Sequence, residues 1–249
     1  MKWFLCLLSL LIFIAQPLQA EGEPLRVAVD PINPPFIMQG ANNQFYGYDI
    51  SMMEYICHTI ERTCQFIPIR FNQILNAVNS KKVDVAASSI GITTERAKLV
   101  NFSLPYLVSY ARFIGPKAYA QQHFSLGLFN DKKIGVTEGS VFPEFIKKIG
   151  VKKPITVPYT NLNDMVDALY RGKINFGFMD EPSALYWQTQ SSGKLVVLGK
   201  SFSYGLGLGI AVNKENLILL QAINNALLKY RESDDFKKNY HAYIEHVHM

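Results

Sequence analysis

The chain has 249 residues and a formal net charge of +5. Its lysines and arginines are scattered rather than clustered, which argues against a nucleic-acid-binding surface. This length allows one large domain or two small ones.

The first residues have the pattern of a secretory signal peptide. Lys2 is followed by an apolar run over residues 3–15, and a small residue, Ala20, ends the segment. The run is shorter than the about 20 residues that a membrane-spanning helix needs, and no second run of spanning length follows. We therefore predict a signal peptide over residues 1–20 and a soluble, periplasmic mature protein of about 229 residues. An uncleaved N-terminal anchor is the alternative.

Beyond residue 20, short strand-like and helix-like segments alternate. The expected strands cover residues 25–29, 65–69, 83–87, 133–136, 155–157, 174–179, 195–198 and 209–212. The expected helices cover residues 48–62, 74–79, 94–100, 143–149, 164–170, 183–188, 217–230 and 235–243. Short apolar strands between helices predict βαβ units and mainly parallel sheets, which is an α/β fold.

The two series of strands and helices are similar in size, which favours two lobes over a single sheet. We expect the chain to cross between lobes near residues 110–115 and again near residues 201–207. Lobe 1 would then be discontinuous, with residues 25–112 and 205–249, and lobe 2 would hold residues 113–204. Two crossings make a two-strand hinge, on which lobes can close around a ligand.

A cation and an anion follow two of the expected strands at their carboxyl ends, where ligands bind in open α/β sheets. Arg96 comes after Ser88, Ser89 and Gly91, and Asp180 ends the strand over residues 174–179. A guanidinium can hold a carboxylate through two parallel hydrogen bonds, and a carboxylate can accept from an ammonium group. The alternatives are a solvated arginine on a capped surface helix and an aspartate that only starts a helix.

Three further positions are candidates for the same site. The turn of Gly139, Ser140 and Val141 precedes a helix, so its N–H groups could bind an anion, or it could be an ordinary turn. Asp30 ends the first expected strand, before a proline-rich turn. Phe71 follows the strand over residues 65–69 and could stack on a ligand or simply pack on the lobe.

Two cysteines, Cys57 and Cys64, lie beyond the predicted signal peptide. An even pair in an exported protein favours a disulfide, here between a helix and the next strand, and two free buried thiols are the alternative. A loop this short would stabilise the fold by about 2–3 kcal/mol. No further ligands have metal-site spacing, and we expect no metal and no cofactor.

Together these segments resemble the periplasmic amino-acid-binding proteins of ABC importers, in the branch of solute-binding protein family 3 that includes the lysine/arginine/ornithine-, histidine- and glutamine-binding proteins. The resemblance covers essentially the whole chain after residue 20. It rests on the order and spacing of LRVAVDPINPPF, YGYDISMMEYI, KKVDVAASSIGITTERAKLVNFSLPY, KKIGVTEGS and RGKINFGFMDEPSA. It implies a type II periplasmic-binding-protein fold with a mainly parallel, helix-flanked sheet in each lobe.

The resemblance also implies ligand-binding roles. Arg96 would bind the α-carboxylate of an amino acid, and Asp180 would bind its α-ammonium. The backbone of Gly91, Ser140 and Val141 would assist Arg96. The ligand side chain would meet Asp30, Ser88, Ser89 and the ring of Phe71, with Asn33 at a position that is often aromatic in relatives and Glu138 as a further anion nearby.

Acidic groups at the side-chain end favour arginine or another basic amino acid as the ligand. The leading hypothesis is a non-catalytic, monomeric carrier that delivers this amino acid to an ABC permease. A secreted cyclohexadienyl dehydratase, acting on prephenate or arogenate with Glu138 or Asp30 as its acid, is the alternative. A third reading is a sensor that docks on a membrane receptor.

Overall fold

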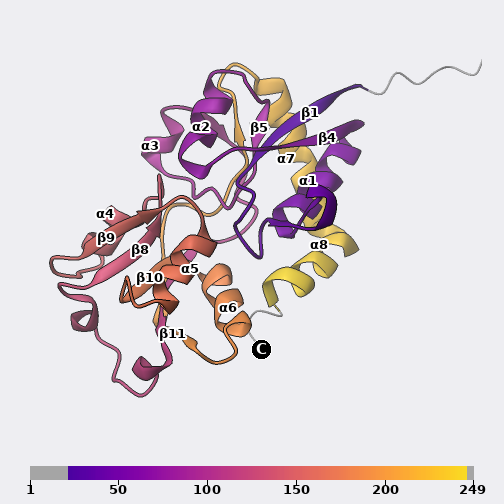
Figure 1. The fold of residues 1–249 in the computed structure, drawn as a ribbon. Coiled ribbons are helices and arrows are strands. Elements are labelled where there is room, and N and C mark those ends of the chain that lie inside the picture. Colours follow the sequence, from indigo (N-terminus) through magenta and orange to yellow (C-terminus); the bar gives the residue numbers. More distant parts are fainter. Residues whose placement is uncertain (1–21, 246–249) are drawn as a thin grey trace, which may run out of the picture.

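The computed structural model describes residues 22–245, so the predicted signal peptide lies outside the described residues. These residues form two lobes (Figure 1). The indigo and purple N-terminal segments share one lobe with the yellow C-terminal helices, and the magenta to orange middle of the chain forms the other. Within residues 22–245, no helix combines the length and the apolar character that crossing a bilayer requires.

The first lobe contains a five-stranded sheet in the order β4-β1-β5-β12-β6. Strand β1 pairs in parallel with β4 and β5, and β12 is antiparallel to β5 and β6. Since β12 follows the whole second lobe in sequence, this lobe is built from both ends of the described chain. The strands are β1 (Gly22–Val29), β4 (Arg62–Pro68), β5 (Val85–Ala86), β6 (Asn101–Phe102) and β12 (Ala211–Val212).

The second lobe contains a sheet in the order β11-β7-β10-β8-β9. Strand β8 is parallel to β9 and β10, whereas β7 is antiparallel to β10 and β11. In each sheet four of the five strands run in the same direction, and one strand, β12 or β7, runs against them. In this sense each lobe has a mainly parallel sheet, as the sequence indicates. The strands are β7 (Tyr110–Pro116), β8 (Lys133–Thr137), β9 (Ile155–Tyr159), β10 (Phe176–Asp180) and β11 (Leu195–Ser203). A hairpin of β2 (Met38–Gln39) and β3 (Phe45–Tyr46) extends the first lobe.

Helices cover the sheets, and their bounds follow the sequence pattern with four notable differences. The helix expected from residue 74 begins at Phe71, and the helices expected to end at residues 62 and 100 end at Thr59 and Ala97. The C-terminal helix divides into an α-helix and a π-helical turn over Tyr240–Ile244. The helices are α1 (Tyr48–Thr59), α2 (Phe71–Asn79), α3 (Thr94–Ala97), α4 (Phe142–Lys148), α5 (Leu162–Tyr170), α6 (Glu181–Gln190), α7 (Leu217–Glu232) and α8 (Asp234–Asn239). Short 3₁₀ turns cover Ala41–Asn43, Lys117–Tyr119 and Leu126–Phe129.

The alternation of side chains along β1 explains why helices lie on both faces of the first sheet. Val27 and Val29 belong to the core cluster that contains the buried side chains of α1 and α7. Ala28 between them belongs to another cluster with Ile74 and Val78 of α2. Successive residues of a strand point to opposite faces, so an unbroken apolar strand needs cover on both sides.

Two connections between the lobes run side by side. Residues 103–109 lead from β6 to β7, and residues 204–210 lead from β11 back to β12. The Tyr204 N–H donates to the Ser109 carbonyl at 3.0 Å, and the Leu208 N–H donates to the Leu107 carbonyl at 2.8 Å. These bonds form a two-strand hinge close to the predicted crossings, while the predicted lobe boundaries at 112/113 and 204/205 stay predictions.

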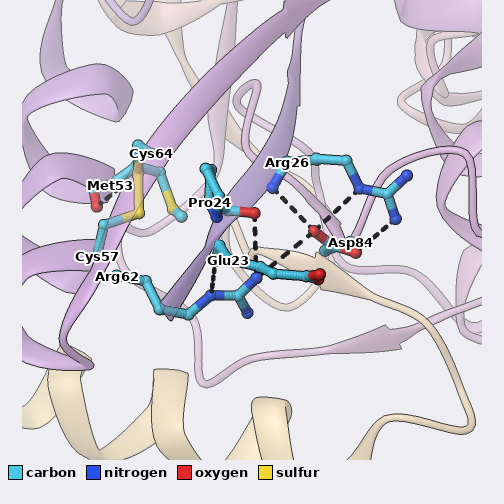
Figure 2. Close-up of a disulfide and its surroundings, with 8 residues drawn as sticks. All are labelled: Glu23, Pro24, Arg26, Met53, Cys57, Arg62, Cys64 and Asp84. Carbon is cyan, nitrogen blue, oxygen red and sulfur yellow. Dashed lines mark hydrogen bonds and ion pairs between the residues drawn. A yellow bond between two sulfur atoms is a disulfide. The ribbon is translucent and has the colours of Figure 1, made fainter. Parts of the chain in front are cut away.

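The predicted disulfide is present between Cys57 in α1 and Cys64 in β4, with the Cα atoms 5.7 Å apart (Figure 2). It ties α1 to the edge strand of the first sheet. Beside it, the Arg62 guanidinium donates from Nε to the Glu23 carbonyl at 2.6 Å. Figure 2 also shows Arg26 paired with Asp84, with Nη2 and Oδ1 2.7 Å apart.

Removing the disulfide should lower the free energy of unfolding. Because the bond closes a short loop, we expect the Cys57→Ser/Cys64→Ser protein to lose about 2–3 kcal/mol in urea unfolding. A reducing agent should shift the wild-type midpoint to that of the double variant and leave the variant itself unchanged. Equal midpoints for oxidised wild type and variant would contradict this expectation.

Candidate functional site

A cavity lies between the lobes and is lined by residues of both. Residues at the carboxyl ends of β1, β8 and β10 line this cavity, as expected for open α/β sheets. Its lining consists of Asp30, Ile32, Asn33, Phe71, Ser89, Arg96, Thr137, Ser140, Val141, Phe142, Leu162, Asp180 and Tyr204.

Arg96 is the cation of this cavity. It lies in α3, a helix that begins because the Thr93 hydroxyl accepts from the Arg96 N–H. The side chain is buried, and its guanidinium donates to the Gly91 carbonyl at 2.9 Å and to the Gly139 carbonyl at 3.3 Å. The Phe71 ring centroid lies 5.3 Å from the Arg96 Cζ atom. A guanidinium has five N–H donors, so several remain for a carboxylate ligand.

Burial lowers the pKa of the Arg96 guanidinium, and the nearby Tyr204 and Asp180 oppose that effect. The side chain stays charged at any physiological pH, because an arginine pKa starts above 12. Its two hydrogen-bond partners are neutral carbonyls, so within the described residues no anion is hydrogen-bonded to the guanidinium. An anionic group of a ligand would supply such a partner.

Asp180 is the anion that the other lobe contributes. It is the last residue of β10 and is buried at the start of α6. The Tyr204 hydroxyl donates to its Oδ1, and the Ser89 hydroxyl donates to its Oδ2 at 3.0 Å. Burial raises the pKa of Asp180 to about 6, although these two hydrogen bonds and the charge of Arg96 lower it.

Asp30 and the Ser88–Ser89 segment form the wall of the cavity in the first lobe. The Asp30 N–H donates to the Ser88 Oγ at 3.1 Å, and the Asn33 side-chain amide donates to the Ser89 Oγ at 2.8 Å. Asp30 is buried, and this burial raises its pKa to about 7 despite a hydrogen bond from the Ile32 N–H. The carboxyl therefore holds a proton part of the time near neutral pH.

The two lobes touch each other around the cavity. Arg96 donates to Gly139, and Ser89 donates to Asp180, so each lobe contributes a polar group to the other. Gly139 has a φ of +77°, and a Cβ atom on it would lie 2.7 Å from the Cα of Asn72 in α2. The lobes can approach this closely because residue 139 has no side chain.

The structure brings most of the sequence-predicted site residues together. Eight of them line the cavity: Asp30, Asn33, Phe71, Ser89, Arg96, Ser140, Val141 and Asp180. Ser88 is fully buried and bonds to the Asp30 main chain, and the Gly91 carbonyl accepts from Arg96. Both lie one layer behind the cavity surface. Glu138 is exposed and is not part of the lining.

Five lining residues have no functional signal in the sequence: Ile32, Thr137, Phe142, Leu162 and Tyr204. Phe142 and Leu162 have the apolar character of core positions. Tyr204 comes from the returning hinge segment, and its ring occupies the space beside Gly91, where a Cβ atom would lie 2.6 Å from the Tyr204 Cε2. Among residues 22–245, no group of three or more His, Cys, Asp or Glu side chains is arranged to hold a metal ion.

The family model "Bacterial extracellular solute-binding proteins, family 3" matches residues 25–246. The chain belongs to this family. The "ABC transporter arginine-binding protein 1" of Escherichia coli (strain K12) is 29% identical over 223 residues, which cover 88% of this chain and 90% of that protein. The fold is accordingly the two-lobe type II fold of periplasmic amino-acid-binding proteins.

Solved structures agree with this assignment. An ancestral arginine-binding protein bound to arginine superposes with a TM-score of 0.82 at 28% identity, covering 90% of this chain and 99% of the other. An ancestral arginine-binding protein bound to glutamine has a TM-score of 0.80 at 30% identity, covering 89% and 97%. The ancestral amino-acid-binding protein AncCDT-1, a precursor of cyclohexadienyl dehydratase, has a TM-score of 0.79 at 25% identity, covering 88% and 95%.

The raised pKa of Asp30 predicts how stability depends on pH. The folded-state pKa, about 7, lies above the unfolded value near 3.8, so the stabilising proton is fully present at low pH and is lost as the pH rises through 7. Asp30→Asn should therefore be more stable than wild type at pH 8, by roughly 2–4 kcal/mol, and about equal to it below pH 4.

Urea unfolding of the two proteins without added solute, at several pH values between 4 and 8, measures this difference. Asp84→Asn is the control, because Asp84 is paired with Arg26 and its pKa is lowered, so this variant should lose stability relative to wild type at pH 8. A difference between Asp30→Asn and wild type that does not grow with pH would contradict the expectation.

Proposed function

We propose that this protein captures a free L-amino acid between its lobes, with arginine or another basic amino acid preferred, and delivers it to the permease of an ABC importer. It acts as a monomer in the periplasm after removal of its signal peptide, with no catalytic step. The observation that carries the proposal is one cavity that holds a buried guanidinium from one lobe and a buried carboxylate from the other.

Arg96 would hold the α-carboxylate through its free N–H groups, with the main chain of Ser140 and Val141 beside it. Asp180 would hold the α-ammonium. Two fixed charges of opposite sign select a zwitterion, since a molecule that lacks either group leaves a buried charge without a partner.

The preference for a basic side chain follows from the charges around the cavity. Asp30 and Asp180 line it, Asp49 lies buried behind it, and Arg96 is the cation in its lining. A bound amino acid with a neutral side chain is a zwitterion and adds no net charge to the cavity. A basic amino acid carries one more positive charge on its side chain, which would offset the charge of a second carboxylate. Asp30 can meet that side-chain cation, because its carboxyl lies in the cavity lining and accepts from the Ile32 N–H without a cationic partner of its own among the described residues. The E. coli relative's name and the arginine-bound ancestral protein support this choice.

A thermal-shift screen tests the proposal. The purified protein without its first 20 residues is heated with each of the twenty amino acids, ornithine and citrulline. We expect the largest rise in Tm for arginine, lysine or ornithine, because a ligand that binds only the folded state stabilises it by several kcal/mol at a large excess over Kd. A rise for glutamine alone would overturn the basic preference. No rise for any amino acid, together with turnover of prephenate or arogenate, would replace the carrier with the dehydratase.

Closure of the lobes should depend on Gly139. We expect Gly139→Ala to weaken L-arginine binding tenfold or more, because the new methyl group would meet Asn72 of the other lobe. Gly172→Ala is a matched control in the same lobe: its φ is +66°, similar to that of Gly139, but nothing lies within 4 Å of the new Cβ. Both variants should lose about 1 kcal/mol of stability from left-handed backbone strain. Calorimetry that gives both variants equal affinity would show that this contact does not control closure.

A further inference from the structure

Asp49 is a buried carboxylate outside the cavity lining. It lies in the first turn of α1, has no exposed surface, and is fixed by its own N–H, which donates to the Phe36 carbonyl at 3.0 Å. Its Oδ2 accepts from the Ser89 N–H at 2.7 Å and from the Tyr106 hydroxyl at 3.0 Å.

The contribution of Asp49 to stability does not explain its presence. Its Oδ1 has no hydrogen-bond partner within the described part of the chain. A carboxylate buried with one oxygen unpartnered costs free energy that an apolar side chain of similar size would not cost. The position therefore points to a role beyond holding the core together.

Ser89 is the residue that Asp49 holds, and its conformation is unusual. Its φ is +42°, in the left-handed region that non-glycine residues rarely adopt. In that conformation its hydroxyl accepts from Asn33 and donates to Asp180 of the other lobe. A continuous series of hydrogen bonds thus runs from Asp49, inside the first lobe, through Ser89 to the carboxylate that the second lobe contributes.

We propose that Asp49 is a positioning residue for solute capture: it fixes the main chain of Ser89 so that the serine hydroxyl meets Asp180 when the lobes close. This inference rests on the proposed function. Tyr106, the second donor to Asp49, belongs to the hinge connection over residues 103–109, so Asp49 also ties the Ser89 loop to the hinge.

The groups that face Asp49 fit this role. Tyr48 and Tyr106 lie against it, Tyr230 of α7 interacts with it electrostatically, and the charge of Asp180 acts on it from the cavity side. Burial and, to a smaller extent, the charge of Asp180 raise the pKa of Asp49 to about 7, although the bonds from Ser89 and Tyr106 lower it. Both hydrogen bonds favour the ionised carboxylate, the form that accepts most strongly from the Ser89 N–H.

A double-mutant cycle tests the coupling with L-arginine as the probe. Asp49→Asn keeps the shape of the side chain but removes its charge, and Ser89→Ala removes the hydroxyl. We expect Asp49→Asn to weaken binding about five- to tenfold in the wild-type background and less than twofold in the Ser89→Ala background, because Asp49 acts through that hydroxyl. Equal losses in both backgrounds would overturn the proposal, since they would mean that Asp49 acts independently of the serine hydroxyl.

Asp84→Asn is the matched control. Asp84 also belongs to the first lobe and accepts a main-chain N–H, that of Arg26 at 2.9 Å, but it does not line the cavity. This variant should bind L-arginine within twofold of wild type. If it loses as much affinity as Asp49→Asn, a general loosening of the lobe explains the result and the proposal is wrong.

A second readout needs no solute. In amide hydrogen-exchange measurements on the wild-type protein, the Ser89 N–H should exchange slowly, because the buried Asp49 carboxylate accepts it. A Ser89 N–H that exchanges as fast as the amides of exposed loops overturns the proposal even if Asp49→Asn fails to fold. If wild type does not bind L-arginine, the ligand assignment fails while the exchange of the Ser89 N–H still tests whether Asp49 holds this main chain.

Discussion

The structure depends on placing charges of opposite sign, one from each lobe, in a single cavity. Arg96 and Asp180 are both buried, and their hydrogen-bond partners are mostly neutral carbonyl and hydroxyl groups. Each charge has therefore lost its water without gaining a full counter-charge. A zwitterion would place a carboxylate against Arg96 and an ammonium group against Asp180. Only a ligand that carries both groups offsets the desolvation of both protein charges, which makes the site selective for it.

The fold supplies this arrangement in an economical way. The parallel strands β1, β8 and β10 end at the cleft, which brings Asp30, Asp180 and the turn after β8 to a common edge. The two hinge connections are hydrogen-bonded to each other and contribute Tyr204, which donates to Asp180. The segment that permits lobe movement thus also orients a charge of the site.

The sequence predicts the parts of the site that have a local cause. Asp180 is recognisable because it comes at the end of an apolar strand, and Arg96 because it lies at the start of the helix that follows another strand. Both places fall at the ligand-binding edge of an α/β sheet. The disulfide follows from two cysteines in an exported chain. Both inferences need only the residues near each position.

The remaining features depend on contacts between distant segments, which one sequence does not encode locally. Tyr204 is about 24 residues from Asp180, and nothing near it marks a cavity residue. Gly139 has the pattern of an ordinary turn until Asn72 of the other lobe is seen against it. Asp49 resembles a residue that favours a helix start, and its bond to Ser89, 40 positions away, is visible only in three dimensions. Glu138 lies beside the glycine turn in the sequence, yet it is exposed and does not line the cavity.

The most direct test of the charge clamp compares L-arginine with agmatine, which lacks only the carboxylate, on wild type and on Arg96→Ala by calorimetry. The account predicts that Arg96→Ala weakens L-arginine by about 3–5 kcal/mol, as when a buried charge loses its partner, and changes agmatine affinity little. Arg171→Ala, an exposed arginine of the second lobe, should change neither. If Arg96→Ala weakens both molecules equally, the guanidinium does not hold the carboxylate and the account is wrong.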